Sequence, residues 1–305
     1  MRILIIVDKF NWAYHAIAKN LVKYNPKPEW RLDIEKAKKN KKRIKKISHK
    51  YDYFFVMGWQ NFPIVSFLPK DKTLVGIHSF HSWDERKTTP ELSAIPPVEL
   101  IGNLNEFLGV NAVSQRLTDL FRGLGVSKIH YTPNGSDIEL FKPPEKRPDT
   151  FYAGYSGTKK HDWRKGITEF ILPATKKAGV PCKLAMHHDK TEIPSEKMPQ
   201  FYQQLGCYVC ASSSEGFSLS VLEAAACGVP VISTRVGGCT ELIADGVNGY
   251  LVDRDVDAIA DRLNILKNDK KLQKSMSDNM RSIMVREYSW KDRVVDWFDF
   301  MEKIL

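Results

Sequence analysis

The sequence predicts an α/β protein with two doubly wound domains, on three observations. Short continuous apolar runs alternate with amphipathic stretches, the pattern of buried parallel strands with helices on both faces. The chain has 305 residues, enough for two domains of roughly 150 residues each. The proline-rich segment at 141–150, FKPPEKRPDT, can be neither a helix interior nor a central strand, and it therefore predicts a linker. Ligands of such sheets bind beyond the carboxyl ends of the strands, so we expect a site in a cleft between the domains.

The N-terminal half should contain four buried strands, because four apolar runs are continuous and flanked by breakers. Helical periodicity follows the first run, in WAYHAIAKNLVKY, and the last run, in SQRLTDLFRGLG. The expected strands are ILIIV at 3–7, YFFVMG at 53–58, TLVGIH at 73–78 and LGVNAVS at 108–114.

The same alternation resumes after the linker, which places a first domain at 1–145 and a second at 146–288. Residues 255–305 have a helical pattern throughout. The expected strands of the second domain are FYAGYSG at 151–157, CKLAMHH at 182–188, CYVCASS at 207–213, PVISTR at 230–235 and GYLV at 249–252.

Composition excludes several classes of protein. No apolar run approaches the roughly 20 residues that cross a bilayer, and ILIIV is too short for the core of a signal peptide. We therefore expect a cytoplasmic protein. Five cysteines indicate no disulfide framework, and the C-x-x-C of Cys207 and Cys210 lies on a predicted strand without the second pair that a zinc site needs.

The basic charge is concentrated in the first half of the chain. Residues 1–150 hold 25 Lys and Arg against 16 Asp and Glu, whereas residues 151–305 hold 21 against 20. One run, Lys36–Lys50, has nine basic residues and no acid, with a thin apolar stripe of Ile34, Ala37, Ile44 and Ile47 at helical spacing. This helix is either an ordinary solvated surface or a surface for an anionic partner, which would be an acidic membrane or a nucleic acid.

Two carboxylates lie eight positions apart in a small and apolar segment, SSSEGFSLSVLEAAACGVP at 212–230. Glu215 should lie in the loop that leaves a strand, and Glu223 should lie in the helix that Ser218 begins. Unpaired amides at a helix start bind phosphate, and carboxylates bind hydroxyls. The pattern therefore suits a nucleoside diphosphate sugar, although Glu223 could equally pair with an arginine and Glu215 could be an ordinary loop acid.

The segment EGFSLSVLEAAACGVPVISTRVGGCTELIADGVNGYLV resembles the signature of glycosyltransferase family 4, a group 1 family of retaining enzymes with the GT-B fold of two Rossmann-like domains. Glu215 and Glu223 match its E-x7-E pattern. Residues 111–143 resemble the passage between its domains, and RKG at 164–166 resembles its Lys-Gly. YSW…WF resembles its C-terminal helix, which would place residues 289–305 back on the first domain.

The resemblance implies a role for each matched residue. Glu223 would bind the ribose, and Glu215 would bind the donor sugar. Lys165 would neutralise the diphosphate, and His78 would touch the donor sugar from the first domain, with His81 as a competitor. The backbone of Gly216, Phe217, Ser218 and Leu219 would lie close to the sugar and phosphates. The family needs neither a metal nor a nucleophilic carboxylate, and the D-x-D-like sequence at 253–255 is expected to be a loop.

Three departures from the family pattern limit these assignments. DKFNWAYHA follows the first strand, where the family has a glycine-rich loop. The family's Gly-Arg is replaced by a segment in which Lys159, Lys160 or Arg164 must meet the diphosphate. The spacing between Lys165 and Glu215 is short enough to have lost one β-α unit, which leaves Met186–Asp189 as the expected contact of the base.

The sequence leaves several classes of sugar acceptor as alternatives. A glycolipid or polysaccharide precursor at a membrane suits the basic helix, and a modified base in DNA would suit the aromatic segments MGWQNF and HSFHSW. A small soluble acceptor is a third possibility. A GT-B epimerase, a phosphorylase and a non-catalytic basic binding protein are the alternatives to a transferase. UDP is the expected nucleotide because it is common in the family.

Overall fold

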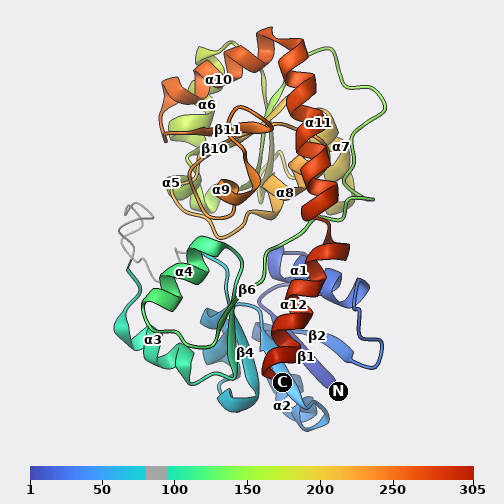
Figure 1. The fold of residues 1–305 in the computed structure, drawn as a ribbon, viewed down its shortest axis with the longest axis vertical. Coiled ribbons are helices and arrows are strands. Elements are labelled where there is room, and N and C mark those ends of the chain that lie inside the picture. Colours follow the sequence, from blue (N-terminus) through green and yellow to red (C-terminus); the bar gives the residue numbers. More distant parts are fainter. Residues whose placement is uncertain (80–94) are drawn as a thin grey trace. The chain divides into compact units, whose positions relative to one another are not determined.

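The computed structural model describes residues 1–79 and 95–305, which divide into two compact units (Figure 1). Among these residues, unit 1 comprises 1–79, 95–134 and 290–305, and unit 2 comprises 135–289. Each unit is built around one parallel sheet. The domain boundaries expected from the sequence stay a prediction. No helix in the described part of the chain is both long and apolar enough to cross a membrane.

Unit 1 contains a six-stranded sheet in the order β2-β1-β3-β4-β5-β6, with every neighbouring pair parallel. Strand β1 is central to the core, because all residues from Ile3 to Val7 are fully buried. The strands are β1 Arg2–Val7, β2 Arg31–Lys36, β3 Tyr53–Val56, β4 Thr73–Ile77, β5 Gly109–Ala112 and β6 Ile129–Tyr131.

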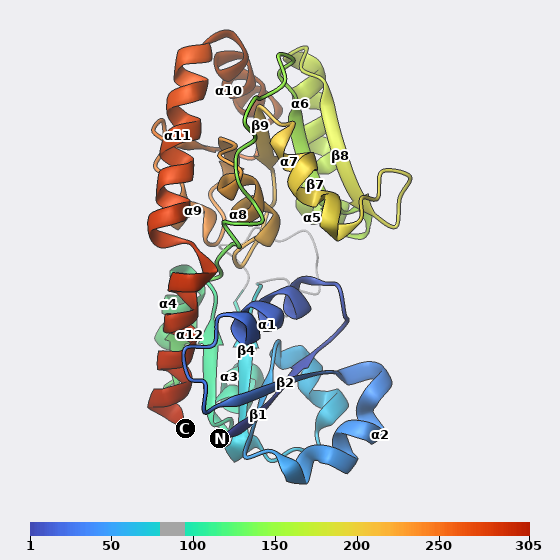
Figure 2. The ribbon, with the colours of Figure 1, turned by 90° about the vertical axis from the view of Figure 1, so that its right-hand side faces the viewer.

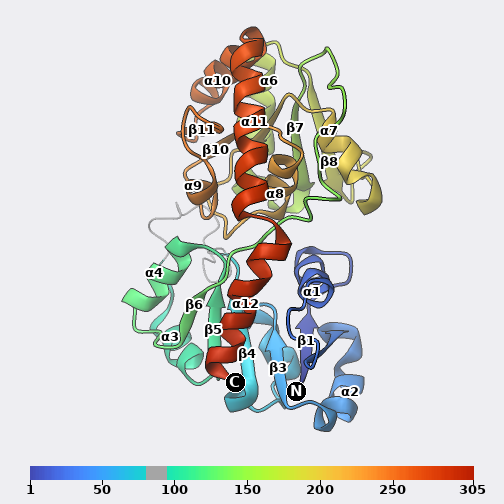
Figure 3. The same ribbon diagram turned by 45° about the vertical axis from the view of Figure 1, so that its right-hand side comes forward.

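The C-terminal helix α12, Trp290–Ile304, packs along the sheet of unit 1 (Figure 3). Trp297 is fully buried, and its Nε1 donates to the Pro133 carbonyl at 2.9 Å. Its ring lies 6.0 Å from that of Phe55 in β3. The other helices of this unit are α1 Ala13–Lys23, α2 Ala37–Ile47, α3 Val98–Asn105 and α4 Gln115–Gly123.

Unit 2 contains a five-stranded sheet in the order β11-β10-β9-β7-β8, again parallel throughout. Strand β8 forms one edge of this sheet (Figure 2). The strands are β7 Ala153–Thr158, β8 Cys182–His187, β9 Cys207–Cys210, β10 Val231–Thr234 and β11 Gly249–Val252.

Helices pack on both faces of the sheet of unit 2, with α6 against α10 on one side and α8 against α7 and α11 on the other (Figure 1). This arrangement confirms the doubly wound α/β class expected from the sequence. The helices are α5 Asp162–Lys165, α6 Leu172–Lys177, α7 Met198–Gln203, α8 Leu219–Ala226, α9 Cys239–Leu242, α10 Val256–Asn268 and α11 Lys270–Glu287, with a π-helical turn at Ile167–Ile171.

The basic run differs from its expected form at its start. Ile34, which the sequence placed in the apolar stripe of the helix, lies in strand β2 opposite Ile5 of β1. The helix α2 begins at Ala37, and its buried residues are Ala37 and Ile44. Strand β2 was not expected because RLDIEK has too many charged residues to read as a continuous apolar run.

Candidate functional site

Two loops of unit 2 meet at the carboxyl ends of neighbouring strands. One follows β9 and carries Glu215, and the other follows β7 and carries Lys165. The Ser213 amide donates to the Arg164 carbonyl at 2.8 Å, which ties the loops together. Arg254 reinforces the junction. Its Nε donates to the Ala211 carbonyl after β9 at 2.9 Å, and its Nη2 donates to the Trp163 carbonyl after β7 at 3.1 Å.

Glu215 is the centre of this junction. Its side chain is 9% exposed and forms an ion pair with Lys165 and a second one, at 3.5 Å, with Arg164 Nη1. Ser212 Oγ donates to Glu215 Oε1 at 2.7 Å. Burial on its own would raise the pKa of this carboxyl. The charges of Lys165 and Arg164 and the hydrogen bonds from Lys165 and Ser212 outweigh burial and lower the pKa to about 2.

The basic residues around Glu215 differ in their surroundings. Arg164 is buried, and its Nη1 donates to the Ser214 carbonyl at 2.5 Å. Its Nε is also buried and has no hydrogen-bond partner among the described residues. Lys159 and Lys160 are exposed in the turn after β7. Burial, together with Arg164, Lys165 and Lys160, lowers the pKa of His161 to about 4, so this ring is neutral at pH 7.

The segment from Gly216 to Leu219 is held against the loop that precedes α9. The Gly238 amide donates to the Gly216 carbonyl at 2.7 Å. Gly237 has a φ of +43°, and a Cβ there would lie 2.0 Å from the Gly216 carbonyl oxygen, so only glycine fits. The buried Phe217 ring packs directly on Gly238. This close packing fixes the path of the chain into α8.

Ser218 occupies the position expected for the helix cap, but its side chain does not form a capping hydrogen bond. Its Oγ instead lies 3.0 Å from Ser220 Oγ. The amides of the first turn of α8 are therefore not blocked by the Ser218 side chain, as an anion site at this helix start requires.

Glu223 lies in α8, one turn after its start, and is partly buried. Tyr202 OH donates to Glu223 Oε2 at 2.8 Å. Burial raises the pKa of Glu223 to about 7, although the hydrogen bond from Tyr202 works in the opposite direction. The alternative of a structural pair with an arginine finds no support, because no salt bridge to Glu223 occurs among the described residues.

His78 follows β4 in unit 1, at the carboxyl end of the strand as expected. Its ring makes an edge contact with Tyr14 at 4.9 Å and lies 6.1 Å from Trp297. Its Nε2 is buried, faces Gly76, and has no partner in the described part of the chain. Burial lowers the pKa of His78 to about 3, so the imidazole is neutral. Its predicted contact with the donor sugar stays a prediction, and its competitor His81 lies outside the described residues.

The segment Met186–Asp189 ends β8 and turns sharply, with His188 at a φ of +62°. His187 Nδ1 lies 2.5 Å from Glu192 Oε1, and Glu192 Oε2 accepts from the His188 amide at 3.0 Å. The expected base contact is not tested by this geometry.

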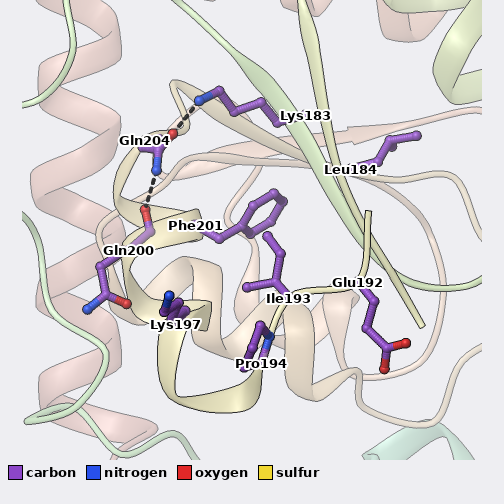
Figure 4. Close-up of a pocket in the computed structure, with 9 residues that line it drawn as sticks. All are labelled: Lys183, Leu184, Glu192, Ile193, Pro194, Lys197, Gln200, Phe201 and Gln204. Carbon is purple, nitrogen blue, oxygen red and sulfur yellow. Dashed lines mark hydrogen bonds between the residues drawn. The ribbon is translucent and has the colours of Figure 1, made fainter. Parts of the chain in front are cut away.

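A cavity of about 510 Å³ lies beside β8, between that strand and α7 (Figure 4). Its lining includes none of the residues expected at the site, so the cavity is separate from the Glu215 junction. The lining residues are Lys183, Leu184, Glu192, Ile193, Pro194, Lys197, Gln200, Phe201 and Gln204.

Three residues that contribute to the site were missed at the level of sequence. Ser212 precedes Glu215 by three positions and could have been considered as its partner. Tyr202 contacts Glu223 from α7, and Arg254 contacts both loops from the turn after β11. That turn contains the D-x-D-like sequence, and Asp255 caps α10 there by accepting from the Asp257 and Ala258 amides at 2.8 and 2.9 Å. Nothing in the local sequence indicates these long-range contacts.

Residues 184–283, which include both glutamates, match the family described as Glycosyl transferases group 1. The match covers 100 of the 305 residues, and this segment is similar to the group 1 glycosyltransferases. An uncharacterised glycosyltransferase of Methanocaldococcus jannaschii is 32% identical over 101 residues, which cover 33% of this chain and 28% of that protein. A D-inositol 3-phosphate glycosyltransferase of Corynebacterium urealyticum is 37% identical over 100 residues, which cover 32% of this chain and 23% of that protein. The matched segments thus span about a quarter of these curated relatives.

Solved structures are similar to the whole chain in fold. Sucrose-phosphate synthase from Thermosynechococcus elongatus superposes with a TM-score of 0.76 at 17% identity, covering 99% of this chain and 98% of the other. Anabaena HepE, crystallised with UDP and glucose, gives 0.74 at 15% identity and covers 99% of each chain. The chain therefore has the GT-B fold, as its sequence predicted.

Proposed function

We propose that this protein is a retaining glycosyltransferase that moves a sugar, a hexose or a pentose, from a nucleoside diphosphate sugar to a hydroxyl acceptor, without a metal or other cofactor. The observation that carries the proposal is the Glu215 junction. A carboxylate kept ionised lies between two cations, beside the start of a helix whose amides are not capped by a side chain. This arrangement offers hydroxyl and phosphate recognition within one pair of loops.

Each group then has a defined task in the proposed reaction. Lys165, together with Lys159, Lys160 or Arg164, would neutralise the diphosphate, whose negative charge grows as the bond to the sugar breaks. Glu215 accepts hydrogen bonds from sugar hydroxyls, and Glu223 accepts them from the ribose.

The acceptor oxygen attacks the anomeric carbon on the face that the diphosphate leaves, and its proton passes to the departing phosphate oxygen. The bond between the anomeric carbon and the phosphate oxygen breaks as the bond to the acceptor oxygen forms, so the reaction needs no covalent enzyme intermediate. The neutral His78 would contact the donor sugar as a hydrogen-bonding group, because its lowered pKa excludes a cationic role.

UDP is the proposed nucleotide. HepE has been crystallised with UDP, with UDP and glucose, and with UDP-glucose, and it shares the fold of this chain. A thermal-shift panel of UDP-, GDP-, ADP- and dTDP-sugars tests this choice. UDP-sugars should raise the melting temperature of the wild type and not that of Glu223→Ala. Turnover of the stabilising donor should persist in EDTA, and NMR of the product should show the anomeric configuration of the donor. No stabilisation by any nucleotide sugar would contradict the proposal.

The surface of α2 supports a membrane acceptor, such as a glycolipid or polysaccharide precursor. Six lysines of this helix are exposed and form no ion pair with any described residue: Lys38, Lys39, Lys41, Lys42, Lys45 and Lys46. Arg43 instead pairs with the buried Glu35 at 2.6 Å and fixes the helix. Each basic residue near an anionic bilayer contributes roughly 1 kcal/mol of attraction. We therefore propose peripheral binding of this cytoplasmic enzyme to the inner face of the membrane.

Vesicle sedimentation tests this surface. The wild type should bind vesicles that contain anionic lipid at low salt and release them as salt rises, whereas Lys41→Glu/Lys42→Glu/Lys45→Glu should not bind. The matched control reverses three exposed lysines of unit 2 that form no ion pair with a described residue, Lys146, Lys176 and Lys271, and should bind like the wild type. Tighter binding to duplex DNA than to vesicles across the same salt series would instead favour the nucleic acid acceptor.

A further inference from the structure

A chain of hydroxyl groups runs from Glu223 to strand β7. Tyr202 OH lies 2.8 Å from Glu223 Oε2 and also 2.8 Å from Ser156 Oγ. Tyr202 is fully buried and Ser156 is 5% exposed, so neither can exchange its partner for bulk water. Ser156 Oγ also lies 3.3 Å from the buried Tyr208 OH of β9. A buried chain of this kind restricts the orientation of every group in it.

The direction of these hydrogen bonds follows from counting protons. An ionised carboxylate only accepts, and a tyrosine has one proton to donate. Tyr202 must therefore give its proton to Glu223, and Ser156 must give its own to Tyr202. If Glu223 were protonated, it could donate to Tyr202 instead and the order would reverse. The direction of the hydrogen bonds in the chain is thus tied to the ionisation of Glu223.

The second oxygen of the carboxylate is left available. Glu223 Oε1 has no partner among the described residues, and the Glu223 side chain is only partly buried. Oε2 thus accepts a hydrogen bond from the buried Tyr202, while Oε1 can accept one from a ligand.

We propose that Tyr202 is a positioning residue, which holds Glu223 Oε2 and favours the ionised form of the carboxylate, so that Oε1 is directed at a ligand hydroxyl. This inference rests on the proposed function, in which Glu223 binds the ribose. It adds the residue that prepares Glu223 for that contact and makes donor binding depend on pH.

The groups that face Glu223 favour this assignment. Tyr202 approaches from α7, and the Cys227 thiol lies nearby at the end of α8 itself. The guanidinium groups of Arg147 and Arg281 bind carbonyls at the far end of α8. Among these groups in the described part of the chain, Tyr202 alone donates a hydrogen bond to the carboxylate of Glu223.

A ligand-free titration tests the inference directly. The side-chain carboxyl ¹³C resonance of Glu223, assigned with Glu223→Gln, is followed against pH in the wild type and in Tyr202→Phe. The phenylalanine keeps the ring and loses the donor, so the midpoint should rise by about one pH unit. Tyr250→Phe, which removes a hydroxyl from β11, should titrate like the wild type. Ser156→Ala should shift the midpoint in the same direction by less, and it replaces Tyr202→Phe if that variant does not fold. An unchanged midpoint in these variants overturns the inference.

Binding of UDP, measured by calorimetry from pH 5.5 to 8.5, links the titration to the proposed function. Tyr202→Phe should weaken UDP binding by about fivefold at pH 7 and recover much of the loss at pH 8.5, with Tyr250→Phe unchanged. A uniform loss at all pH values would show a merely structural role and overturn the inference. A wild type that binds no nucleotide, while its Glu223 midpoint still responds to Tyr202→Phe, would overturn the proposed function and leave the positioning contact intact.

Discussion

Replacement of Glu215 by glutamine should destabilise unit 2 in a way that depends on pH. The change removes the negative charge and leaves Lys165 and Arg164 facing each other in a buried site. The pKa of Glu215 falls from 4.5 to about 2 on folding. At about 1.4 kcal/mol per pH unit, this shift corresponds to about 3 kcal/mol of stability at pH 7. Loss of one member of a buried ion pair costs a similar amount.

The sign of the pH dependence follows from the lowered pKa. The stabilisation is complete above the unfolded value of 4.5 and is lost as the pH falls through about 2. The gap between the wild type and Glu215→Gln should therefore shrink by about 1.4 kcal/mol between pH 7 and pH 3.5.

Urea unfolding at these two pH values, followed by circular dichroism, measures the gap. The matched control is Asp278→Asn, which breaks an exposed pair with Lys274 and should cost less than about 0.5 kcal/mol. The double variant Glu215→Gln/Lys165→Met should lose less unfolding free energy than the sum of the losses in the two single variants, because both changes disrupt the same interaction. A cost below about 1 kcal/mol for Glu215→Gln, or one that is the same at both pH values, would refute the argument.

Three further changes have defined outcomes. Glu223→Gln should be more stable than the wild type by up to about 3 kcal/mol at pH 8 and equally stable at pH 4. The reason is that the raised pKa of Glu223 makes folding of the wild type less favourable as the pH rises from 4.5 to about 7. Equal urea midpoints at pH 8 would contradict this prediction. Gly237→Ala should lower stability by more than about 3 kcal/mol, whereas Gly246→Ala, also at positive φ but in open space, should cost about 1 kcal/mol by thermal unfolding. Trp297→Phe should cost about 2 to 3 kcal/mol through lost packing and the lost bond to Pro133, while the exposed Trp163→Phe should leave the melting temperature unchanged.

In unit 1, the strands that the sequence predicted are those buried on both faces. Strands β1, β3, β4 and β5 read as continuous apolar runs because helices cover both sides of a parallel sheet. Strand β2 lies at the edge of its sheet and carries charges on four of six positions, and β6 has only three residues. Neither segment has the continuous apolar pattern of a buried strand, so each can be identified as a strand only from its pairing with a neighbouring strand.

The sequence predicted which residues belong to the site, but it did not predict the contacts between them. Glu215 and Lys165 were each identified, but the sequence separates them by 50 positions and cannot show that they form a pair. Arg164 was one of three candidates for contact with the diphosphate, and the sequence could not show that it is buried and bonded to the Ser214 carbonyl. Tyr202 lies in a short amphipathic helix whose sequence gives no reason to place its hydroxyl on Glu223. Such contacts depend on which helix packs against which strand, and that information is absent from local patterns.

The two glutamates that share one short segment have opposite environments, and this difference assigns their roles. Glu215 lies between cations, which keep it ionised at any physiological pH. Glu223 lies in an apolar helix face with one hydroxyl donor, and its pKa of about 7 lets it change charge near neutrality. Carboxyls whose pKa values are driven apart in this way are suited to different tasks. Any pH dependence of donor binding between pH 6 and 8 should therefore come from Glu223. Glu223→Gln should flatten that profile, because the amide cannot titrate, and a profile that Glu223→Gln leaves unchanged would assign the titration to another group.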